Sequence, residues 1–271
     1  MKSRKRRSFL GKGHAEQIAK SNGAGSVERV IGCLIVHGYT GGPYEVEPLE
    51  RYLVAETNWE ISVPTLQGHG EQLNFTDVRY TDWIGETERA LMKLHQSCDR
   101  IFVIGFSMGG MIAAYLAATS SVDKLVLLAP ARKILSFKYL GMDLVEMIGD
   151  GLKGKLTEND RFVQVKGKLA DVSFAANMEF MKLVQYTKAY IPHVKVPVFI
   201  AQGKKDELVP YQTIYTIEEE IGSTEKEIVF FGESDHFICL SDDGSVLNQL
   251  VHRFLCRDDH ACQLKEESLF S

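Results

Sequence analysis

The residues best suited to carry chemistry centre on a serine in a glycine-rich turn. Residues 105–110, Gly-Phe-Ser-Met-Gly-Gly, match the pattern G-x-S-x-G. The turn follows a short apolar run at 100–104 and opens an apolar helical pattern at 111–118. This context is the setting of a nucleophile elbow, in which a sharp turn exposes the serine hydroxyl above a sheet. It favours a nucleophilic role for Ser107 over the alternative of an ordinary strand–helix turn that contains a serine.

A serine becomes a good nucleophile beside a base, and the base needs a carboxylate to orient it. When the nucleophile lies on such an elbow, the chain order is serine, acid, histidine. Of the histidines after residue 190, only His236 lies in a loop just past an expected strand. Asp206 follows the expected strand that ends at Ala201, which makes it the predicted acid rather than a mere turn residue. Asp235 and Glu207 are the rival acids, and both side chains are expected to point elsewhere.

The reaction also needs donors for the negatively charged oxygen of a tetrahedral intermediate. One is expected to be the backbone N–H of Met108, the residue after the nucleophile, and the second should come from the loop after the first strand. Residues 37–43, His-Gly-Tyr-Thr-Gly-Gly-Pro, form that loop, and the N–H of Tyr39 is the candidate. His37 precedes the serine in the chain, so we expect it to hold the loop through a local hydrogen bond and not to act as the base.

Short apolar runs that alternate with helical patterns must position these residues. Strands are expected at 29–36, 59–63, 100–104, 124–128, 196–201 and 227–231, and helices at 44–56, 81–97 (with Thr81 as N-cap), 111–118, 211–221 and 244–256. This alternation predicts an α/β fold with a mainly parallel sheet flanked by helices on both faces. Each polar motif of the predicted site follows an expected strand, and open sheets of this class bind ligands outside the carboxyl ends of their strands.

Regular alternation breaks between residues 131 and 190. The predicted organisation is a core at 26–130 and 191–256, interrupted by a small helical cap insertion at 131–190, between a basic, flexible tail at 1–25 and a polar tail at 257–271. Thioethers and rings in the insertion would accommodate an acyl chain. The candidate substrate-binding residues are Met142, Met147, Phe174, Met178 and Met181. The alternative is that they only pack the insertion onto the core.

Composition and charge argue against several classes of partner. The formal net charge is −5, although the first 25 residues hold seven basic residues and one acidic residue. The acidic body argues against a nucleic-acid partner, and the basic start is interpreted as a solvated tail. Five scattered cysteines form no C-x-x-C, so neither a disulfide framework nor a metal site is expected. We expect no signal peptide and no integral membrane association, hence a cytoplasmic protein, while the oligomeric state stays open.

The motifs together resemble those of a known family. The chain is similar to the bacterial carboxylesterase and monoacylglycerol lipase group of the α/β-hydrolases, from about Val30 to Phe254. The similarity includes the elbow and the loop at 37–43, and also Q-G-H-G at 67–70, G-K-K-D-E-L-V-P at 203–210, S-T-E-K-E-I-V at 223–229 and S-D-H at 234–236. It implies an α/β-hydrolase fold and hydrolysis of short- to medium-chain esters or monoacylglycerols without a cofactor.

The chain departs from this group at two positions. The residue before the serine is often His or Leu in the group, whereas this chain has Phe106. Many members carry an Asp five residues after the catalytic histidine, where this chain has Ser241 followed by Asp242. Two other functions stay open from the residues alone: a thioesterase or other serine acyl hydrolase of the same fold, and a non-catalytic binding module.

Overall fold

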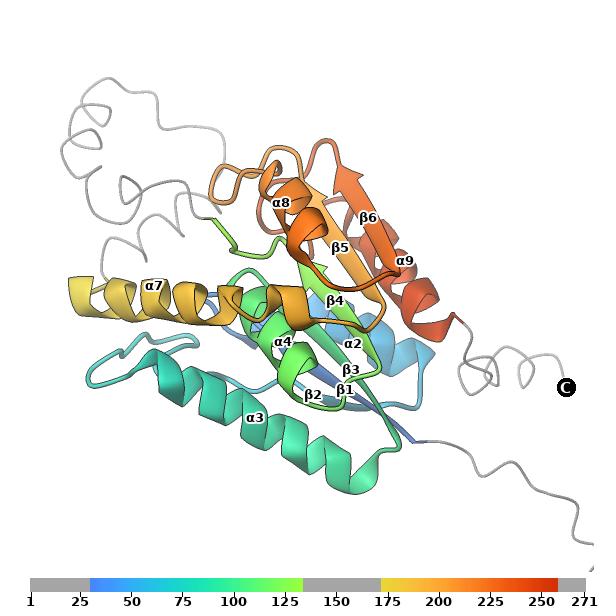
Figure 1. The fold of residues 1–271 in the computed structure, drawn as a ribbon, viewed down its shortest axis with the longest axis horizontal. Coiled ribbons are helices and arrows are strands. Elements are labelled where there is room, and N and C mark those ends of the chain that lie inside the picture. The colour runs from blue at the N-terminus through green and yellow to red at the C-terminus, as the bar shows by residue number, and fades with distance from the viewer. Residues whose placement is uncertain (1–29, 134–171, 258–271) are drawn as a thin grey trace, which may run out of the picture.

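The computed structural model describes residues 30–133 and 172–257, which form one six-stranded parallel sheet covered by helices (Figure 1). The strand order is β2-β1-β3-β4-β5-β6. The strands are β1 Ile31–Val36, β2 Glu60–Ser62, β3 Arg100–Phe106, β4 Lys124–Leu128, β5 Val198–Gly203 and β6 Lys226–Phe231. The chain first adds β2 beside β1 and then returns to the other side of β1 with β3, so the strand order reverses there. The described part therefore has the predicted α/β architecture.

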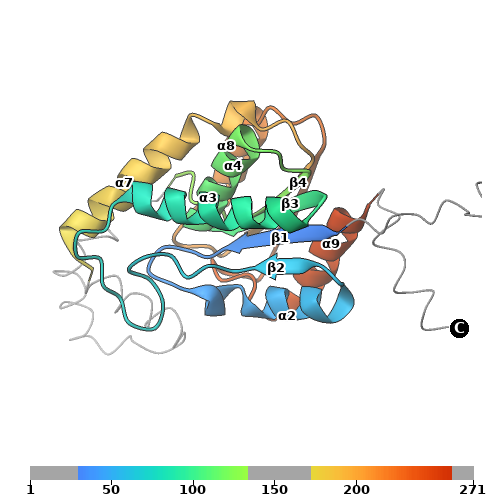
Figure 2. The ribbon, with the colours of Figure 1, turned by 90° about the horizontal axis from the view of Figure 1, so that it is seen from below.

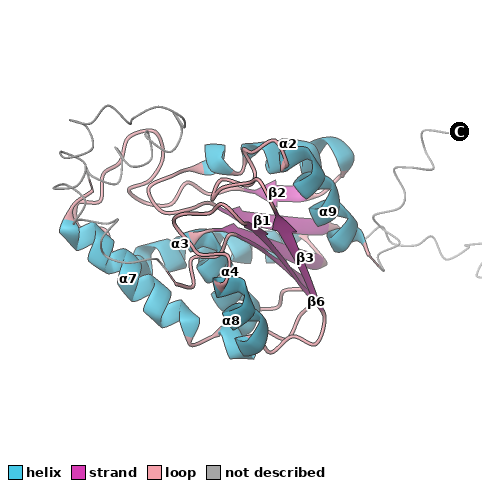
Figure 3. Cartoon of the chain, turned by 90° about the horizontal axis from the view of Figure 1, so that it is seen from above, coloured by secondary structure: helices cyan, strands magenta, loops and turns pink. Residues whose placement is uncertain are grey.

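The helices lie on both faces of the sheet, as Figures 2 and 3 show. One face carries α3 Tyr80–Ser97, α4 Met108–Thr119, α7 Phe174–Lys188 and α8 Thr213–Glu220. The opposite face carries α2 Glu47–Glu56 and α9 Gly244–Cys256, which also contact each other. Two short 3-10 turns, η1 Pro43–Glu45 and η3 Ile191–His193, complete the described elements. The sheet is thus the middle of three layers.

The central strands are mostly apolar because both of their faces are covered. Successive side chains of a strand point to opposite faces. In β1, Leu34 and Val36 therefore pack with the layer that contains α3 and α4, whereas Cys33 and Ile35 pack with α2 and α9. The same alternation continues through β3, β4 and β5. Such near-continuous apolar runs are the sequence signature of a doubly covered parallel sheet.

Several element boundaries differ from the sequence-based expectations by a few residues. The expected helix at 44–56 is divided into η1 and α2, and α2 has Pro48 in its first turn, where a missing N–H costs nothing. Helix α3 begins at Tyr80, so Thr81 is not its N-cap; instead Asp82 accepts a hydrogen bond from the N–H of Arg79 at 2.8 Å. Helix α4 begins three residues earlier than expected, directly after Ser107.

Helix α7 lies within the predicted cap insertion at 131–190, of which residues 134–171 lie outside the described range. It packs along α3 and α4 through one face. The buried residues of that face are Ala176, Asn177, Phe180, Leu183, Val184 and Thr187. In the part of the chain that the structure describes, no helix combines the length and the apolar character needed to cross a bilayer.

A buried lysine joins the sheet to the last helix. Lys124 begins β4 and is 7% exposed. Its Nζ donates hydrogen bonds to the carbonyl oxygens of Phe254 and Leu255, both at 3.0 Å, and to that of Arg257. These carbonyls lie at the C-terminal end of α9, where backbone acceptors lack helical partners and the helix dipole favours a cation.

Replacing Lys124 with Met should therefore destabilise the fold. The change keeps an apolar chain of similar length but removes the donor from three carbonyls, two of them in buried contacts, which predicts a loss of about 1.5–3 kcal/mol in the free energy of unfolding. Urea unfolding followed by far-UV circular dichroism measures the loss. Lys93→Met, at an exposed position of α3, is the control. Equal midpoints for the two variants would contradict a stabilising role for Lys124.

Candidate active site

Ser107 occupies a strained turn between β3 and α4. Its backbone angles are φ 54° and ψ −114°, a region that residues with a Cβ rarely adopt. The strain is held from both sides: the N–H of Ser107 donates to the carbonyl of Leu128 at 2.8 Å, and its carbonyl accepts from the N–H groups of Gly110 and Ala131 at 3.0 and 3.1 Å. Strain maintained by surrounding structure is typical of functional sites. The observed conformation is that of a nucleophile elbow.

Two glycines permit the close packing around this turn. A Cβ atom on Gly105 would come within 2.1 Å of the carbonyl oxygen of Gly109. A Cβ atom on Gly109 would come within 2.2 Å of the carbonyl oxygen of Val36 in β1. Both contacts are with backbone, which cannot move aside. The first and last glycines of the G-x-S-x-G pattern are therefore required by the approach of α4 to β3 and β1.

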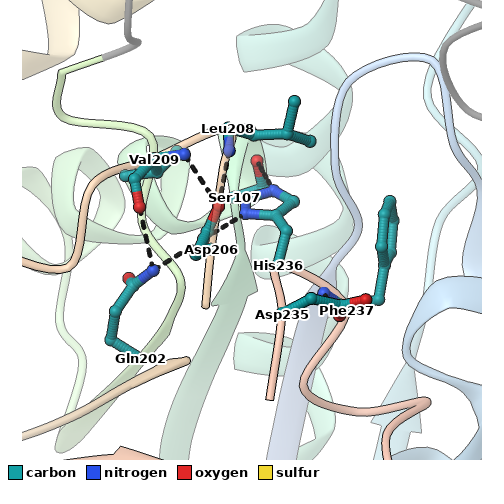
Figure 4. Close-up of polar contacts among 8 residues, drawn as sticks. All are labelled: Ser107, Gln202, Asp206, Leu208, Val209, Asp235, His236 and Phe237. Atoms are coloured by element: carbon teal, nitrogen blue, oxygen red, sulfur yellow. Dashed lines mark hydrogen bonds and ion pairs between the residues drawn. The ribbon is translucent and has the colours of Figure 1, made fainter. Parts of the chain in front are cut away.

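Ser107, His236 and Asp206 form one continuous hydrogen-bonded chain (Figure 4). The hydroxyl of Ser107 lies 2.9 Å from Nε2 of His236, and Nδ1 of His236 lies 2.6 Å from Oδ2 of Asp206. All three residues are buried, at 6–7% exposure. They come from loops after β3, β6 and β5, so the parallel sheet brings them to the same edge. The sequence-predicted triad residues thus meet with the geometry that general-base activation of a serine needs.

Asp206 is held by four hydrogen bonds. Oδ1 accepts from the N–H groups of Leu208 and Val209, both at 2.8 Å. Oδ2 accepts from His236 and from Nε2 of Gln202, the latter at 2.6 Å. Sequence reasoning missed Gln202. The available signal was a fully buried amide inside an otherwise apolar strand, since buried polar side chains require a partner.

The rival acids lie apart from this chain, as expected. Oδ1 of Asp235 accepts from the N–H of Phe237 at 2.9 Å, which directs its carboxylate into its own loop. Glu207 is exposed. Figure 4 shows Asp235 on the far side of His236 from Asp206.

The surroundings of His236 tune its basicity. Burial lowers the pKa of His236, but the charge of Asp206 and the hydrogen bond to it raise that pKa, as do the charges of Glu45 and Asp235. The net effect is a pKa above the ordinary value of 6.5. A raised pKa makes an imidazole a stronger base toward a hydrogen-bonded hydroxyl.

The loop after β1 is held by His37, as predicted. Nδ1 of His37 lies 2.8 Å from the carbonyl oxygen of Gly38, and Nε2 accepts a hydrogen bond from the N–H of Leu66 at 3.1 Å. Burial lowers the pKa of His37 to about 4, despite the hydrogen bond to Gly38. The ring is therefore neutral near pH 7 and serves as a fixed donor and acceptor within the loop.

The two predicted oxyanion donors follow the neighbouring strands β1 and β3. Met108 is the first residue of α4, and Tyr39 lies three residues beyond the end of β1. Within the described residues, neither N–H donates to another group. The first N–H groups of a helix have no helical acceptor, so that of Met108 is suited to an anionic oxygen.

The side chain of Tyr39 connects this loop to α7. Its hydroxyl donates to Oδ1 of Asn177 at 3.1 Å, and its ring stacks on that of Phe180 at 4.4 Å between centroids. Sequence reasoning did not include Asn177 or Phe180 among the site residues. Contacts between residues about 140 positions apart leave no local pattern, and only the burial of a polar side chain on α7 hints at a partner.

The predicted substrate-binding residues differ in how far they are exposed, and two of them lie outside the described range. Phe174 is 75% exposed at the start of α7, and Met178 and Met181 are half-buried. Neither methionine belongs to the packed core. Met142 and Met147 lie outside the described residues. The described candidates are therefore not the residues that attach α7 to the core.

The loop that carries His236 is held by hydrogen bonds of its own. The hydroxyl of Ser234 donates to Oδ2 of Asp243 at 2.6 Å and lies 3.0 Å from Oγ of Ser241. Asp242 is exposed. The carboxylate that supports the histidine loop is therefore Asp243, and Ser241 takes part in the same cluster. Among the described residues, no group of histidine, cysteine, aspartate and glutamate side chains could hold a metal ion.

Comparison with known proteins agrees with this geometry. The model of the alpha/beta hydrolase family matches residues 33–249, and the chain belongs to that family. A thermostable monoacylglycerol lipase of Bacillus sp. (strain H-257) is 29% identical, over 84% of this chain and 91% of that protein. A carboxylesterase of Bacillus subtilis (strain 168) is 22% identical, over 82% and 91%. A solved structure from work on the metagenome-derived lipolytic enzymes LipS and LipT has a TM-score of 0.67 at 22% identity, covering 86% of this chain and 96% of that one.

The reactivity of Ser107 should depend on pH through His236. Only the neutral imidazole accepts the serine proton, so the rate of labelling by a fluorophosphonate should rise with pH and reach its half-maximum above pH 6.5. In Asp206→Asn the ring of His236 is still buried, which lowers its pKa, but the negative charge that raises the pKa is gone. That variant should label more slowly, by up to roughly 10⁴-fold, with its midpoint at lower pH. A wild-type midpoint below 6.5 would contradict the raised pKa.

Proposed function

We propose that this protein is a serine ester hydrolase that acts on short- to medium-chain acyl esters, including monoacylglycerols. The observation that carries the proposal is the hydrogen-bonded chain of Ser107, His236 and Asp206 on a nucleophile elbow. Relatives named monoacylglycerol lipase and carboxylesterase, similar over most of the chain, support esters as the substrate class.

The proposed mechanism is acyl transfer in two steps. His236 removes the proton of Ser107 as Oγ attacks the ester carbonyl, and Asp206 stabilises the resulting imidazolium. The N–H groups of Tyr39 and Met108 donate to the oxyanion, each contributing about 3 kcal/mol in the transition state. His236 then protonates the departing alcohol. In the second step it activates a water molecule, which releases the acid and restores the serine, and no cofactor is needed.

The proposed determinant of substrate choice is the insertion at 131–190, acting as a cap. Met178, Met181 and Phe174 on α7, together with Met142 and Met147, are proposed to contact the acyl chain. The half-buried positions of the two α7 methionines, outside the packed core, support this role. Methionine suits such a surface because its unbranched side chain adapts to ligands of different shape.

Two alternatives differ from this proposal in a measurable way. A thioesterase or another serine acyl hydrolase would use the same residues on a different leaving group. A non-catalytic binding module would fold without an activated serine, and rapid labelling by a fluorophosphonate would exclude it. We also propose a cytoplasmic location, which the four free cysteines of the described residues support, since reducing compartments keep thiols unpaired.

Replacing Ser107 with Ala should abolish hydrolysis of p-nitrophenyl butyrate, because no other group forms the acyl-enzyme. The kcat of the variant should be lower than that of the wild type by on the order of 10⁶-fold, close to the rate of the background reaction. Initial rates and fluorophosphonate labelling are measured on the folded variant. Near-native turnover by Ser107→Ala would refute the assigned nucleophile. Hydrolysis of the corresponding thioester faster than the ester by the wild type would favour the thioesterase alternative.

Replacing Met178 or Met181 with Ala should change the preferred acyl-chain length. Removing a thioether that contacts the acyl chain should shift kcat/KM among p-nitrophenyl esters of two to twelve carbons by about 10-fold, equivalent to about 1–3 kcal/mol per contact. Met92→Ala, at a 56% exposed position of α3, is the matched control. If kcat/KM depends on chain length in the same way in these variants as in the control, the two methionines do not contact the substrate.

A further inference from the structure

Glu45 is a buried carboxylate next to the candidate active site, and the proposed mechanism does not use it. It ends the short turn η1 and is 6% exposed. Carboxylates are almost never buried to this extent unless they are paired or hydrogen-bonded, because removing a charge from water is costly. The contacts of Glu45 therefore indicate what its burial achieves.

The carboxylate contacts the loop after β1 on both sides of Tyr39. Oε2 of Glu45 accepts a hydrogen bond from the N–H of Gly38 at 2.9 Å. It also lies against Gly41, where a Cβ atom would come within 1.9 Å of Oε2 and 2.0 Å of Cδ. The missing side chain at Gly41 is what makes room for the carboxylate. Glu45 thus braces the segment that carries the proposed Tyr39 oxyanion donor.

Glu45 also acts on the base. A Cβ atom on Gly38 would lie 3.1 Å from both Oε2 of Glu45 and the ring of Phe106, so the three groups meet. The ring of Phe106 is in turn 5.1 Å from that of His236, between centroids. The negative charge of Glu45 raises the pKa of His236, in addition to the larger effects of burial and of Asp206. A fixed negative charge here favours the imidazolium that forms during acyl transfer.

We propose that Glu45 is a positioning residue, which holds the loop at 37–42 so that the N–H of Tyr39 faces the oxyanion and which stabilises the protonated form of His236. The inference rests on the proposed acyl-transfer function. Because the two contributions depend on different properties of the side chain, an acceptor and a charge, separate substitutions distinguish them.

Glu45→Ala tests the bracing of the loop. The change leaves the N–H of Gly38 buried without its acceptor and frees the loop, so kcat should fall about 10- to 100-fold with a smaller change in KM. Gly41→Ala should act in the same way, because its methyl group displaces the carboxylate. The double variant should then be no slower than Glu45→Ala alone, since both changes remove the same contact. Glu47→Gln, at a half-exposed position paired with Arg51, is the control and should keep wild-type kcat.

Glu45→Gln tests the charge. The amide oxygen still accepts from the N–H of Gly38. Loss of the negative charge makes the imidazolium less stable and the oxyanion more stable, and because these effects oppose each other the plateau kcat should stay within about threefold of the wild type. The acid limb of the kcat/KM profile should move to lower pH. The other charges that act on His236, those of Asp206 and Asp235, are retained. Nearby titratable groups stay neutral across this range: the pKa of His37 is lowered by burial to about 4, that of His69 to about 3, and that of Cys239 is raised to about 12.

Two measurements report on Glu45 without any substrate. NMR titration of His236 should show a lower pKa in Glu45→Gln than in the wild type, and hydrogen exchange should show faster exchange of the Gly38 amide in Glu45→Ala. If the folded wild type hydrolyses no ester, the proposed function fails, and these measurements still decide the role of Glu45. An unchanged His236 titration in Glu45→Gln overturns the electrostatic role. Wild-type kcat and wild-type exchange of Gly38 in Glu45→Ala overturn the bracing role.

Discussion

The close packing of α4 against β3 and β1 is the constraint on which the rest of the site depends. It leaves no space for a Cβ atom at Gly105 or Gly109, and it forces Ser107 into a backbone conformation with positive φ. Such a conformation is unfavourable in isolation, and the hydrogen bonds to Leu128 and Ala131 maintain it. The fold itself therefore places the hydroxyl at the sheet edge, beside His236, with no need for flexible loops to position it.

Around this fixed point, hydrogen bonds hold the buried acid and base in place. The carboxylate of Asp206 accepts four hydrogen bonds, two from backbone N–H groups, one from Gln202 and one from His236. A carboxylate with this many donors has a single orientation, which in turn fixes the ring of His236. Burial alone would lower the basicity of that ring, and the surrounding carboxylates reverse the effect. The same low-dielectric environment that makes isolated charges costly thus makes a matched set of charges effective.

The sequence was sufficient for the fold class and for the meeting of Ser107, Asp206 and His236, because strand ends and chain order are local signals. It was less reliable at element boundaries. Gly109 and Gly110 are poor helix formers, so the helical pattern became visible only at residue 111, although α4 begins at 108. The partners Gln202, Glu45 and Asn177 were missed because tertiary contacts define them. A carboxylate at position 45 resembles any polar residue in the first turn of a helix until the fold shows that it is buried.

The contact of Tyr39 with α7 has a consequence for how the specificity of such an enzyme could change. The residue proposed to supply an oxyanion donor is held through its side chain by Asn177 and Phe180, which lie on α7, in the segment proposed as an insertion, and not in the sheet. Evolution toward new substrates by replacement of that segment would therefore also alter the support of the oxyanion donor. Variation in substrate range and maintenance of catalytic rate are coupled here, so insertions exchanged between relatives would need a compatible residue opposite position 39.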